Sequence, residues 1–360
     1  MTYKDSFYMA KALQLAGNGC YTTDPNPKVG CVLVKNDEII AEGWHVRAGL
    51  GHAEIVALNQ ASNALGATAY VTLEPCSHYG KTGPCCDALI NAGIQRVVIA
   101  MQDPNPLVAG QGIKKMQDAG LNVICGVLEQ DAKALNPGFI KRMTTGFPFI
   151  RSKLAMSLDG RTAMASGESK WITSAESRTD VQRLRAESSV VLTGINTVLA
   201  DNPSLNVRLN EDVTQPIRVI LDSQLQMPTS AKMLGLSGQT WVLTSSMDGQ
   251  KIVNLELSGA LVFQINSKNG HLDLEAVMVF LGQQQINTVL VEAGATLNGA
   301  LLSENLVDEW LVYMAPCILG DQGRGLFHLP AMQKMDDKKQ LNMTAVRQIG
   351  TDLKLTFNTQ

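Results

Sequence analysis

The chain has 360 residues, of which 45% are hydrophobic and 18% are charged, so it is long enough to form two soluble domains with a core each. Its 30 basic and 33 acidic residues give a net charge of −3, which excludes the strongly basic surface that nucleic acid or an anionic membrane would require. The chain has seven cysteines, an odd number, and its N-terminus has no signal-peptide core, so we expect a reduced, cytoplasmic protein without a disulfide framework. No apolar run is long enough to cross a membrane.

Strands and helices alternate in the predicted first half of the chain. The expected strands are 29–34, 38–43, 67–74, 96–101 and 121–125, and the expected helices are 4–16, 53–64, one that starts at Pro84, and 112–119. Such alternation is typical of an α/β sandwich whose active site lies at the ends of strands.

A second unit is predicted to begin at the Gly- and Pro-containing junction 144–149, which gives domains 1–145 and 146–360. Thr173 and Glu176 form a T-x-x-E pattern that predicts a capped helix to about Glu187. The other expected elements are strands at 149–157, 189–194, 218–222, 240–244, 261–265 and 288–292 and a helix at 273–282. The pattern indicates a nucleotide-binding α/β unit.

Two motifs in the first half indicate zinc chemistry: G-H-A-E at 51–54 and E-P-C-S-H-Y-G-K-T-G-P-C at 74–85. Two thiolates and a neutral imidazole offset the charge of zinc and leave its fourth position to water, and a Glu two residues after the His serves as proton shuttle. Glu54 is therefore the predicted general acid/base. The predicted zinc ligands are His52, Cys76 and Cys85.

The eight residues between Cys76 and Cys85 make the spacing longer than the common P-C-x-x-C. We expect this insert to form a substrate loop, because His78 and Lys81 lie in it and could bind an anionic group. The alternative is a structural zinc knot with Cys86 as fourth ligand, and Cys86 also leaves the choice of the second cysteine ambiguous. The presence of a glutamate beside the histidine favours the catalytic interpretation.

Several other polar residues have two interpretations from pattern alone. Asn26 lies between two prolines and is a turn residue or a base-binding amide, with the turn favoured. His45 by itself predicts a surface or hydrogen-bonded core residue. Lys153 interrupts an apolar strand, as a site residue or on a solvated edge, and Glu292 ends an apolar strand, where α/β proteins place site residues. The glycine turn at Gly294 opens a helix that suits either a phosphate or simple packing.

The chain resembles the bifunctional riboflavin-biosynthesis deaminase/reductase family in P-N-P-K-V-G, G-H-A-E, E-P-C-S-H-Y-G-K-T-G-P-C, D-P-N-P, K-L-A-M-S-L-D-G-R-T-A, S-K-W-I-T, V-L-A-D-N-P-S-L-N-V-R and V-E-A-G. The resemblance implies an N-terminal cytidine-deaminase-like α/β/α sandwich and a C-terminal dihydrofolate-reductase-like α/β domain. It also implies two consecutive reactions. The first is zinc-dependent deamination of 2,5-diamino-6-(5-phosphoribosylamino)pyrimidin-4-one to 5-amino-6-(5-phosphoribosylamino)uracil, and the second is NADPH-dependent reduction of the ribosyl group to ribityl.

Carried over by position, the resemblance implies three sets of binding residues. The deaminase substrate would contact Asn26, His45, His78, Lys81 and Asn105. The reductase substrate would contact Lys153, Ser169, Arg185, Leu205, Arg208 and Glu292. The NADPH cofactor would contact Ala155, Trp171, Thr197, Asp201 and the turn at Gly294. Lys153 and Glu292 are also the expected catalytic residues of the reductase, and Arg185 and Arg208 suit the ribose phosphate. The expected partner is this small-molecule phosphoribosylaminopyrimidine rather than nucleic acid or a membrane, and the chain is expected to be a homo-oligomer.

Two other functions compete with this hypothesis. A deaminase of nucleic acid or free nucleosides with an appended domain would need a basic or aromatic channel, whereas aromatic residues are only 5% of the chain and the net charge is negative. A zinc-stabilised binding module without enzymatic activity would have no use for Glu54, so replacing Glu54 by Gln discriminates between the two.

Overall fold

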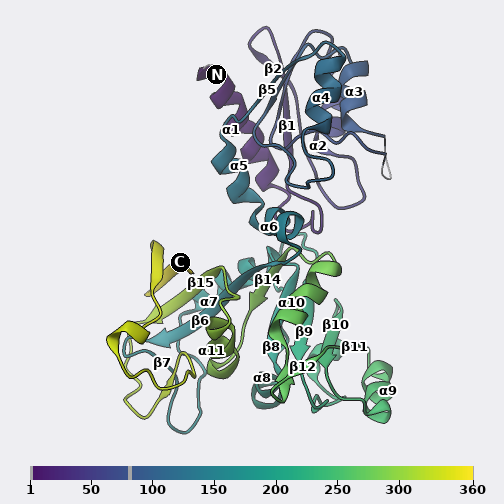
Figure 1. Ribbon diagram of the computed structural model, residues 1–360. Coiled ribbons are helices and arrows are strands. Elements are labelled where there is room, and N and C mark those ends of the chain that lie inside the picture. The colour runs from purple at the N-terminus through teal and green to yellow at the C-terminus, as the bar shows by residue number, and fades with distance from the viewer. Residues whose placement is uncertain (1–2, 80–82, 360) are drawn as a thin grey trace. The chain divides into compact units, whose positions relative to one another are not determined.

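A computed structural model describes residues 3–79 and 83–359 of the chain. The chain divides into two compact units, Met1–Gly146 and Phe147–Gln360, and each is described by itself (Figure 1). No helix within the described residues combines the length and the apolar character that crossing a bilayer requires.

The first unit is built on a five-stranded sheet in the order β2-β1-β3-β4-β5. Strand β1 pairs antiparallel with β2 and β3, whereas β3, β4 and β5 run parallel. The strands are β1 (Gly30–Lys35), β2 (Glu38–Trp44), β3 (Thr68–Val71), β4 (Arg96–Ile99) and β5 (Asn122–Cys125). The helices are α1 (Tyr3–Gly17), α2 (Ala53–Gln60), α3 (Cys85–Asn91), α4 (Gln111–Asp118), α5 (Glu129–Leu135) and α6 (Pro137–Thr145).

Both faces of this sheet are covered by helices. Successive side chains of a strand face opposite sides, and β1 has apolar residues on both: Cys31 and Leu33 pack in one core with residues of α2, α3 and α4, whereas Val32 and Val34 pack in another with residues of α1 and α5. Figure 1 shows α1 and α5 on one side of the sheet and α2, α3 and α4 on the other. The predicted α/β/α sandwich is therefore confirmed.

A buried ion pair fastens α1 to the sheet. Asp5 of α1 is 1% exposed, and its carboxylate accepts hydrogen bonds from the Arg96 guanidinium at 2.8 and 3.1 Å. The Tyr70 hydroxyl donates to the same carboxylate at 3.2 Å. Because Tyr70 and Arg96 belong to β3 and β4, this contact joins the first helix to the centre of the sheet.

The second unit contains a nine-stranded sheet in the order β11-β10-β9-β8-β14-β6-β15-β18-β17. The first seven strands of this order, from β11 through β10, β9, β8, β14 and β6 to β15, run parallel to one another. Strands β18 and β17 continue the sheet at the β15 side as an antiparallel hairpin. The strands are β6 (Phe149–Ser157), β8 (Val190–Gly194), β9 (Ile217–Leu221), β10 (Thr240–Thr244), β11 (Ala260–Gln264), β14 (Thr288–Val291), β15 (Glu309–Ala315), β17 (Leu341–Ile349) and β18 (Asp352–Thr359).

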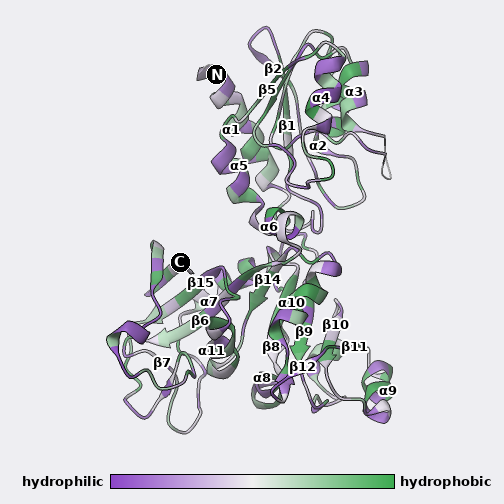
Figure 2. Cartoon of the chain, in the orientation of Figure 1, coloured by the Kyte–Doolittle hydropathy of each residue, from purple (hydrophilic) through white to green (hydrophobic). Residues whose placement is uncertain are grey.

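Helices and small two-stranded ladders complete the second unit. The helices are α7 (Ala175–Ala186), α8 (Ile195–Asp201), α9 (Gly249–Leu257), α10 (Leu274–Gln283) and α11 (Ala295–Ser303), with 3-10 turns η1 (Lys232–Gly235) and η2 (Met335–Asp337). The ladders pair β7 (Arg161–Ala163) with β16 (Arg324–Gly325) and β12 (Ser267–Lys268) with β13 (His271–Leu272). Figure 2 shows apolar residues concentrated on the central strands, while helices such as α9 and α10 carry both apolar and polar residues. This is the pattern of a sheet buried beneath amphipathic helices.

The predicted capping box of the helix after residue 173 is wrong. Helix α7 begins one residue later, with Ser174 as N-cap, and the Ser174 side chain accepts from Ser177 N at 3.2 Å. The Asp352 carboxylate, which belongs to β18, accepts from Ser174 N at 2.8 Å and from the Ser177 hydroxyl at 2.6 Å. A distant strand therefore determines where this helix starts, which a local pattern such as Thr173 and Glu176 does not reveal.

Other differences lie at element ends and in unpredicted elements. The helix expected over 53–64 ends at Gln60, where Ala61 takes an extended conformation, and the Asn63 side chain accepts from Leu65 N at 3.0 Å in the turn that follows. The strand expected over 67–74 ends at Val71. Helices α5, α6 and α9, strand β15 and the hairpin of β17 and β18 were not among the predicted elements.

Candidate active sites

The first candidate site lies where two helices begin. His52 is the N-cap of α2, Cys85 is the first residue of α3, and Cys76 lies in the loop that follows β3. His52 Nδ1 is 3.2 Å from Cys85 Sγ and 3.7 Å from Cys76 Sγ, and the three ligand atoms lie within 4.8 Å of one another. Tetrahedral zinc with ordinary bond lengths would separate such atoms by about 3.6 Å, so these residues could hold one zinc ion.

Cys86 has a different environment from Cys85. Its Sγ donates to Pro75 O at 3.1 Å and lies 3.6 Å from Gly112 O. The three-residue group that could hold a metal contains Cys85 and not Cys86. Pro84, expected in the first turn of α3, is the N-cap instead. The geometry thus favours Cys85 as second cysteine, and no fourth protein ligand joins the group in the described part of the chain.

The environment of these cysteines and of Glu54 suits metal-assisted proton transfer. The hydrogen bond with the Cys85 thiol has the largest effect on Cys76 and lowers its pKa, and His52 lowers it further. Together they outweigh burial, which raises the pKa, and bring it to about 4, so a thiolate is available. Glu54 is 3% exposed, and burial raises its pKa to about 7. A carboxyl group with such a pKa can both accept and release a proton near neutral pH.

Asn26 and His45 form a pair beside the metal group. The Asn26 amide nitrogen and His45 Nε2 are 3.1 Å apart, and His45 Nδ1 is 3.1 Å from Gly51 O. With Nδ1 donating to the carbonyl, Nε2 accepts from the amide, so the imidazole is neutral. The His45 ring packs edge to face against His52 at 5.5 Å between centroids. His45 is thus a hydrogen-bonded core residue, as its pattern predicted, and it lies in contact with a predicted ligand.

The remaining residues expected to bind the deaminase substrate are only partly described. His78 is exposed, and Lys81 lies outside the described residues. Asn105 is half-buried in the loop between β4 and α4, where its backbone N–H donates to Asp103 Oδ1 at 2.8 Å.

Glu74, which is buried two residues before Cys76, was not among the predicted site residues. Its carboxylate accepts four backbone hydrogen bonds from the loop that carries Asn105 and from the start of α4. The available signal was an acidic residue at the end of an apolar strand in T-L-E-P-C.

The second candidate site centres on Lys153 and Glu292. Strand β6 lies between β14 and β15, so the alternative that Lys153 lies on a solvated sheet edge is wrong. Val291 of β14 pairs with Ser152 of β6, which places the next residues, Glu292 and Lys153, beside each other. Burial lowers the pKa of Lys153. No hydrogen-bonding partner binds the Lys153 ammonium within residues 3–79 and 83–359, and this leaves it available as a proton donor.

Arg185 and Arg208 differ in what they can bind. Arg185 of α7 is 8% exposed, and its guanidinium pairs with Glu292 at 2.5 and 3.0 Å and donates to Asn206 O at 3.0 Å. Arg208 is exposed, and among the described residues its side chain donates one hydrogen bond, to Asn206 Oδ1 at 3.0 Å. Of the two arginines, Arg208 is therefore the better placed to receive a phosphate.

The expected cofactor residues come from several elements. Ala155 lies two residues after Lys153 on β6, Thr197 and Asp201 belong to α8, and Gly294 is the N-cap of α11 without a side-chain cap. Trp171 is exposed, with the Arg178 guanidinium 4.7 Å from its ring centroid. Lys170, next to Trp171, forms an ion pair with Asp201 at 3.1 Å.

In two expected substrate residues of the reductase, Ser169 and Leu205, little of the side chain is accessible to a ligand. Ser169 is half-buried next to Lys170. Leu205 packs its side chain into a hydrophobic core with Val198 and Ile220, and its backbone has a left-handed φ of 51°. Any contact of Leu205 with a ligand would therefore involve its backbone.

A buried asparagine that sequence analysis missed secures the glycine turn. The Asn298 amide donates to Ala293 O at 2.9 Å and to Gly294 O at 3.2 Å, and its Oδ1 accepts from the Ser152 hydroxyl at 2.7 Å. The turn at the start of α11 is thus fixed to β6, the strand that carries Lys153.

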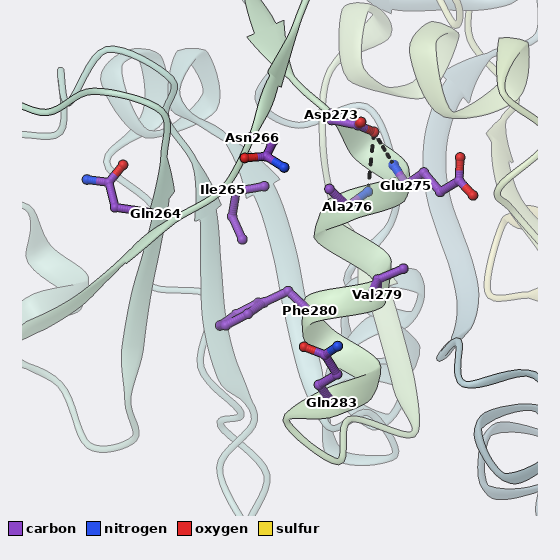
Figure 3. A pocket seen from close by; sticks show the side chains of 9 residues that line it. All are labelled: Gln264, Ile265, Asn266, Asp273, Glu275, Ala276, Val279, Phe280 and Gln283. Atoms are coloured by element: carbon purple, nitrogen blue, oxygen red, sulfur yellow. Dashed lines mark hydrogen bonds between the residues drawn. The ribbon is translucent and has the colours of Figure 1, made fainter.

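A hollow of about 420 Å³ lies elsewhere, beside the end of β11 and α10 (Figure 3). Gln264, Asn266 and Gln283 line it together with the apolar side chains of Ile265 and Phe280. At its rim the Asp273 carboxylate accepts from two backbone N–H groups of α10, as the dashed lines in Figure 3 show, and Glu275 lies beside it. An acidic rim disfavours a phosphorylated ligand, and none of the predicted site residues lines this hollow.

Comparison with known proteins assigns the chain to a family. A family model of the RibD C-terminal domain matches residues 148–355, and one of the cytidine and deoxycytidylate deaminase zinc-binding region matches residues 2–101. The riboflavin biosynthesis protein RibD of Escherichia coli K12 is 51% identical over 363 residues, which cover 97% of this chain and 98% of that protein. The chain belongs to the RibD family. The RibD protein of Haemophilus influenzae is 50% identical and covers 98% of this chain and 97% of its own.

Solved RibD structures share the whole fold. Form 2 of Acinetobacter baumannii RibD has a TM-score of 0.93 and 45% identity, with 99% of each chain covered. A Thermotoga maritima diaminohydroxyphosphoribosylaminopyrimidine deaminase/5-amino-6-(5-phosphoribosylamino)uracil reductase has a TM-score of 0.88 and 34% identity, again over 99% of each chain.

Membership of the RibD family confirms the predicted fold class, a cytidine-deaminase-like domain followed by a dihydrofolate-reductase-like α/β domain. It also confirms the predicted combination of deaminase and reductase in riboflavin biosynthesis. The zinc-binding region of the deaminase family includes the group of His52, Cys76 and Cys85, and the reductase domain implies a nucleotide cofactor.

Proposed function

We propose that the chain catalyses two consecutive steps. Its first unit, proposed as residues 1–145, hydrolyses the 2-amino group of 2,5-diamino-6-(5-phosphoribosylamino)pyrimidin-4-one and releases ammonia. Its second unit, proposed as residues 146–360, reduces the ribosyl group of the resulting 5-amino-6-(5-phosphoribosylamino)uracil to ribityl with NADPH. The observation that carries the proposal is the convergence of His52, Cys76 and Cys85 beside buried Glu54 in a RibD chain.

In the deaminase, His52, Cys76 and Cys85 are the proposed zinc ligands, and the donor set of two thiols and one imidazole fits zinc. Bound zinc would lower the pKa of a water molecule so that it attacks the ring carbon. Glu54 accepts a proton as water adds to C2 and delivers a proton to the departing amine, which leaves as ammonia. Its raised pKa of about 7 suits both transfers.

The proposed contacts of the deaminase substrate surround this group. The Asn26 amide, the His45 ring and Asn105 offer hydrogen bonds to a pyrimidine. His78 and Lys81 belong to the loop between the two cysteines and suit the phosphate of the substrate.

In the reductase, NADPH would supply a hydride to C1 of the sugar. As the C1–O bond of the ribose ring opens, Lys153 donates a proton to the ring oxygen, and its lowered pKa favours this transfer. Glu292 holds Arg185 and adds a negative charge next to Lys153. The proposed remaining substrate contacts are Ser169, Leu205 and Arg208.

The proposed cofactor site combines Ala155, Trp171, Thr197, Asp201 and the turn at Gly294. Helix α11 starts at Gly294 without a side-chain cap, and the backbone N–H groups of a helix N-terminus suit a phosphate of the nucleotide. Asn298 keeps this turn in place.

The decisive experiment measures product mass after purified, zinc-loaded protein meets the phosphoribosylamino diaminopyrimidinone, with NADPH present or withheld. We expect deaminated product without NADPH, and product that is both deaminated and reduced with it. Deamination without any reduction would contradict the reductase assignment, and absence of both products would contradict the substrate. The homo-oligomer stays a prediction, which sedimentation equilibrium tests.

Replacing Arg208 with Ala is expected to weaken binding of the phosphorylated reductase substrate by about 1.5–3 kcal/mol, the typical contribution of a hydrogen bond to a charged group. The measurement is KM for the substrate and for its dephosphorylated analogue. Arg183→Ala, which removes another exposed arginine of the same region, is the control and should leave KM unchanged. An equal loss on both substrates would exclude a phosphate contact of Arg208.

A further inference from the structure

We propose that Glu74 is a positioning residue of the deaminase: it holds the loop 103–110 against the metal group and thereby determines affinity for the pyrimidine substrate. This inference rests on the proposed deaminase function. Glu74 is buried and lies in the chain between the end of β3 and the metal ligand Cys76, and it is not a member of the three-residue metal group.

The Glu74 carboxylate joins both ends of the loop. Its Oε2 accepts from Asp103 N at 3.1 Å, where the loop starts, and from Gly110 N at 2.9 Å, where it ends. Its Oε1 accepts from Gly112 N at 2.8 Å and Ile113 N at 3.1 Å, in the first turn of α4. One side chain therefore closes the loop and caps the helix that follows it.

These four bonds use the full capacity of the carboxylate. An ionised carboxylate offers about four lone-pair sites and no donor, and each is matched by a backbone N–H that has no partner inside a helix. Glu74 is thus neither a spare metal ligand nor a second proton shuttle. Its role is to fix backbone positions.

The same segment is locked to the metal group. A Cβ on Gly112 would lie 2.2 Å from Pro75 O, so α4 packs directly on the residue between Glu74 and Cys76. The Cys86 thiol bridges Pro75 O and Gly112 O from the start of α3. Glu74 therefore ties the loop and α4 to the ligand segment, and Cys86 ties the second ligand helix to the same two segments.

The loop presents Asn105 in a defined orientation. Asn105 Oδ1 accepts from Leu107 N at 3.1 Å, and Asn105 N donates to Asp103 Oδ1 at 2.8 Å. No acceptor binds the Asn105 amide nitrogen among the residues that the structure describes, so this donor is available to a carbonyl or ring nitrogen of a pyrimidine. Movement of the loop would displace that donor and weaken its hydrogen bond to the substrate.

The test replaces Glu74 with Gln in the full chain. Glutamine keeps the size of the side chain but has one acceptor oxygen, and its NH₂ group would face N–H donors, so it can bind the donors of one oxygen only. We expect the deaminase KM to rise about 10-fold, the effect of losing one hydrogen bond to the substrate when the loop is displaced, with zinc content retained and kcat changed much less. Hydrogen exchange should become faster at the amides of Asp103, Gly110, Gly112 and Ile113.

Two further variants make the result specific. Asp5→Asn also replaces a buried carboxylate of the first unit by its amide. Because Asp5 fastens α1 to the sheet and not the loop 103–110, this variant should lower stability without raising the deaminase KM. Glu74→Asp keeps the charge on a shorter side chain and should give a KM between those of the wild type and Glu74→Gln. If Glu74→Gln does not fold, Glu74→Asp tests the inference in its place. The reductase activity of each variant chain should equal that of the wild type.

The outcomes separate this inference from the proposed function. Wild-type KM and wild-type exchange in a zinc-loaded Glu74 variant would overturn the inference even if the wild-type chain deaminates the substrate. Faster exchange at the four amides in a chain whose wild type does not deaminate would support the positioning role and refute the proposed substrate. If a Glu74 variant loses zinc and its kcat falls while KM stays unchanged, Glu74 supports the metal instead of the loop.

Discussion

Replacing Glu54 with Gln is expected to lower deaminase turnover by about 100- to 10,000-fold, the usual contribution of a general acid/base. The amide cannot accept a proton from the attacking water or pass one to the leaving amine. Glu54 lies at the start of α2, two residues after His52 and almost completely buried. Its side chain is not one of the three groups that converge as metal ligands, so zinc should remain bound.

The measurement combines metal content with turnover of the diaminopyrimidinone by the full chain. Glu38→Gln is a matched control, because Glu38 is an exposed carboxylate of β2, and it should behave as wild type. The reductase, assayed with the deaminated substrate, should be unaffected in both variants. Undiminished deamination by zinc-loaded Glu54→Gln would refute the assigned proton shuttle and would leave the zinc group a structural role.

The second large effect concerns the stability of the reductase unit. Replacing Glu292 with Gln is expected to lower the free energy of unfolding by about 3–5 kcal/mol, since removing one partner of a buried ion pair leaves the other charge uncompensated. Arg185 is 8% exposed and is bound by both oxygens of Glu292. Lys153 lies beside them, so the variant would keep two neighbouring cations without their carboxylate.

Urea denaturation, followed by a probe of the second unit, measures this loss. A double variant in which Arg185→Met accompanies Glu292→Gln should lose less stability than the sum of the two single variants, because the two side chains interact directly. A loss below about 1 kcal/mol in Glu292→Gln would mean that the pair contributes no more than a solvent-exposed salt bridge.

The pH dependence of this effect follows from the pKa of Glu292. Burial by itself raises the pKa, but Arg185, through charge and hydrogen bonds, and then Lys153 outweigh burial and lower it. A folded-state pKa below the unfolded value of about 4.3 gives stability that is present above that pH and is lost as pH falls through the folded-state pKa. The stability difference between wild type and Glu292→Gln should therefore shrink on acidification below about pH 4, and a difference that grows in acid would contradict the lowered pKa.

The sequence by itself determined the features that are encoded in short contiguous segments. The metal motif needs only H-A-E and two later cysteines, so His52, Cys76 and the segment that supplies the third ligand could be named before the fold was known. The alternation of strands and helices similarly predicted both α/β units, since the apolar period is a local property. The strand over 149–157 was predicted with the bounds that β6 has.

Only the tertiary structure decided between neighbouring or distant candidates. Cys85 and Cys86 are adjacent in α3, but a helix turns by about 100° per residue, so one thiol joins the metal group and the other binds Pro75 O. The pairing of Glu292 with Arg185 depends on how α7 packs on the end of β14.

The partners of Glu74 show the same physical limit. They lie 29 to 39 residues further along the chain, and Asp352 binds the N-cap residue of α7 from 178 residues away. Patterns in the sequence report which side chains are buried and how they are spaced, whereas the packing of distant segments decides which donor meets which acceptor. A buried carboxylate such as Glu74 acquires its role only when that packing brings unpaired backbone N–H groups to it.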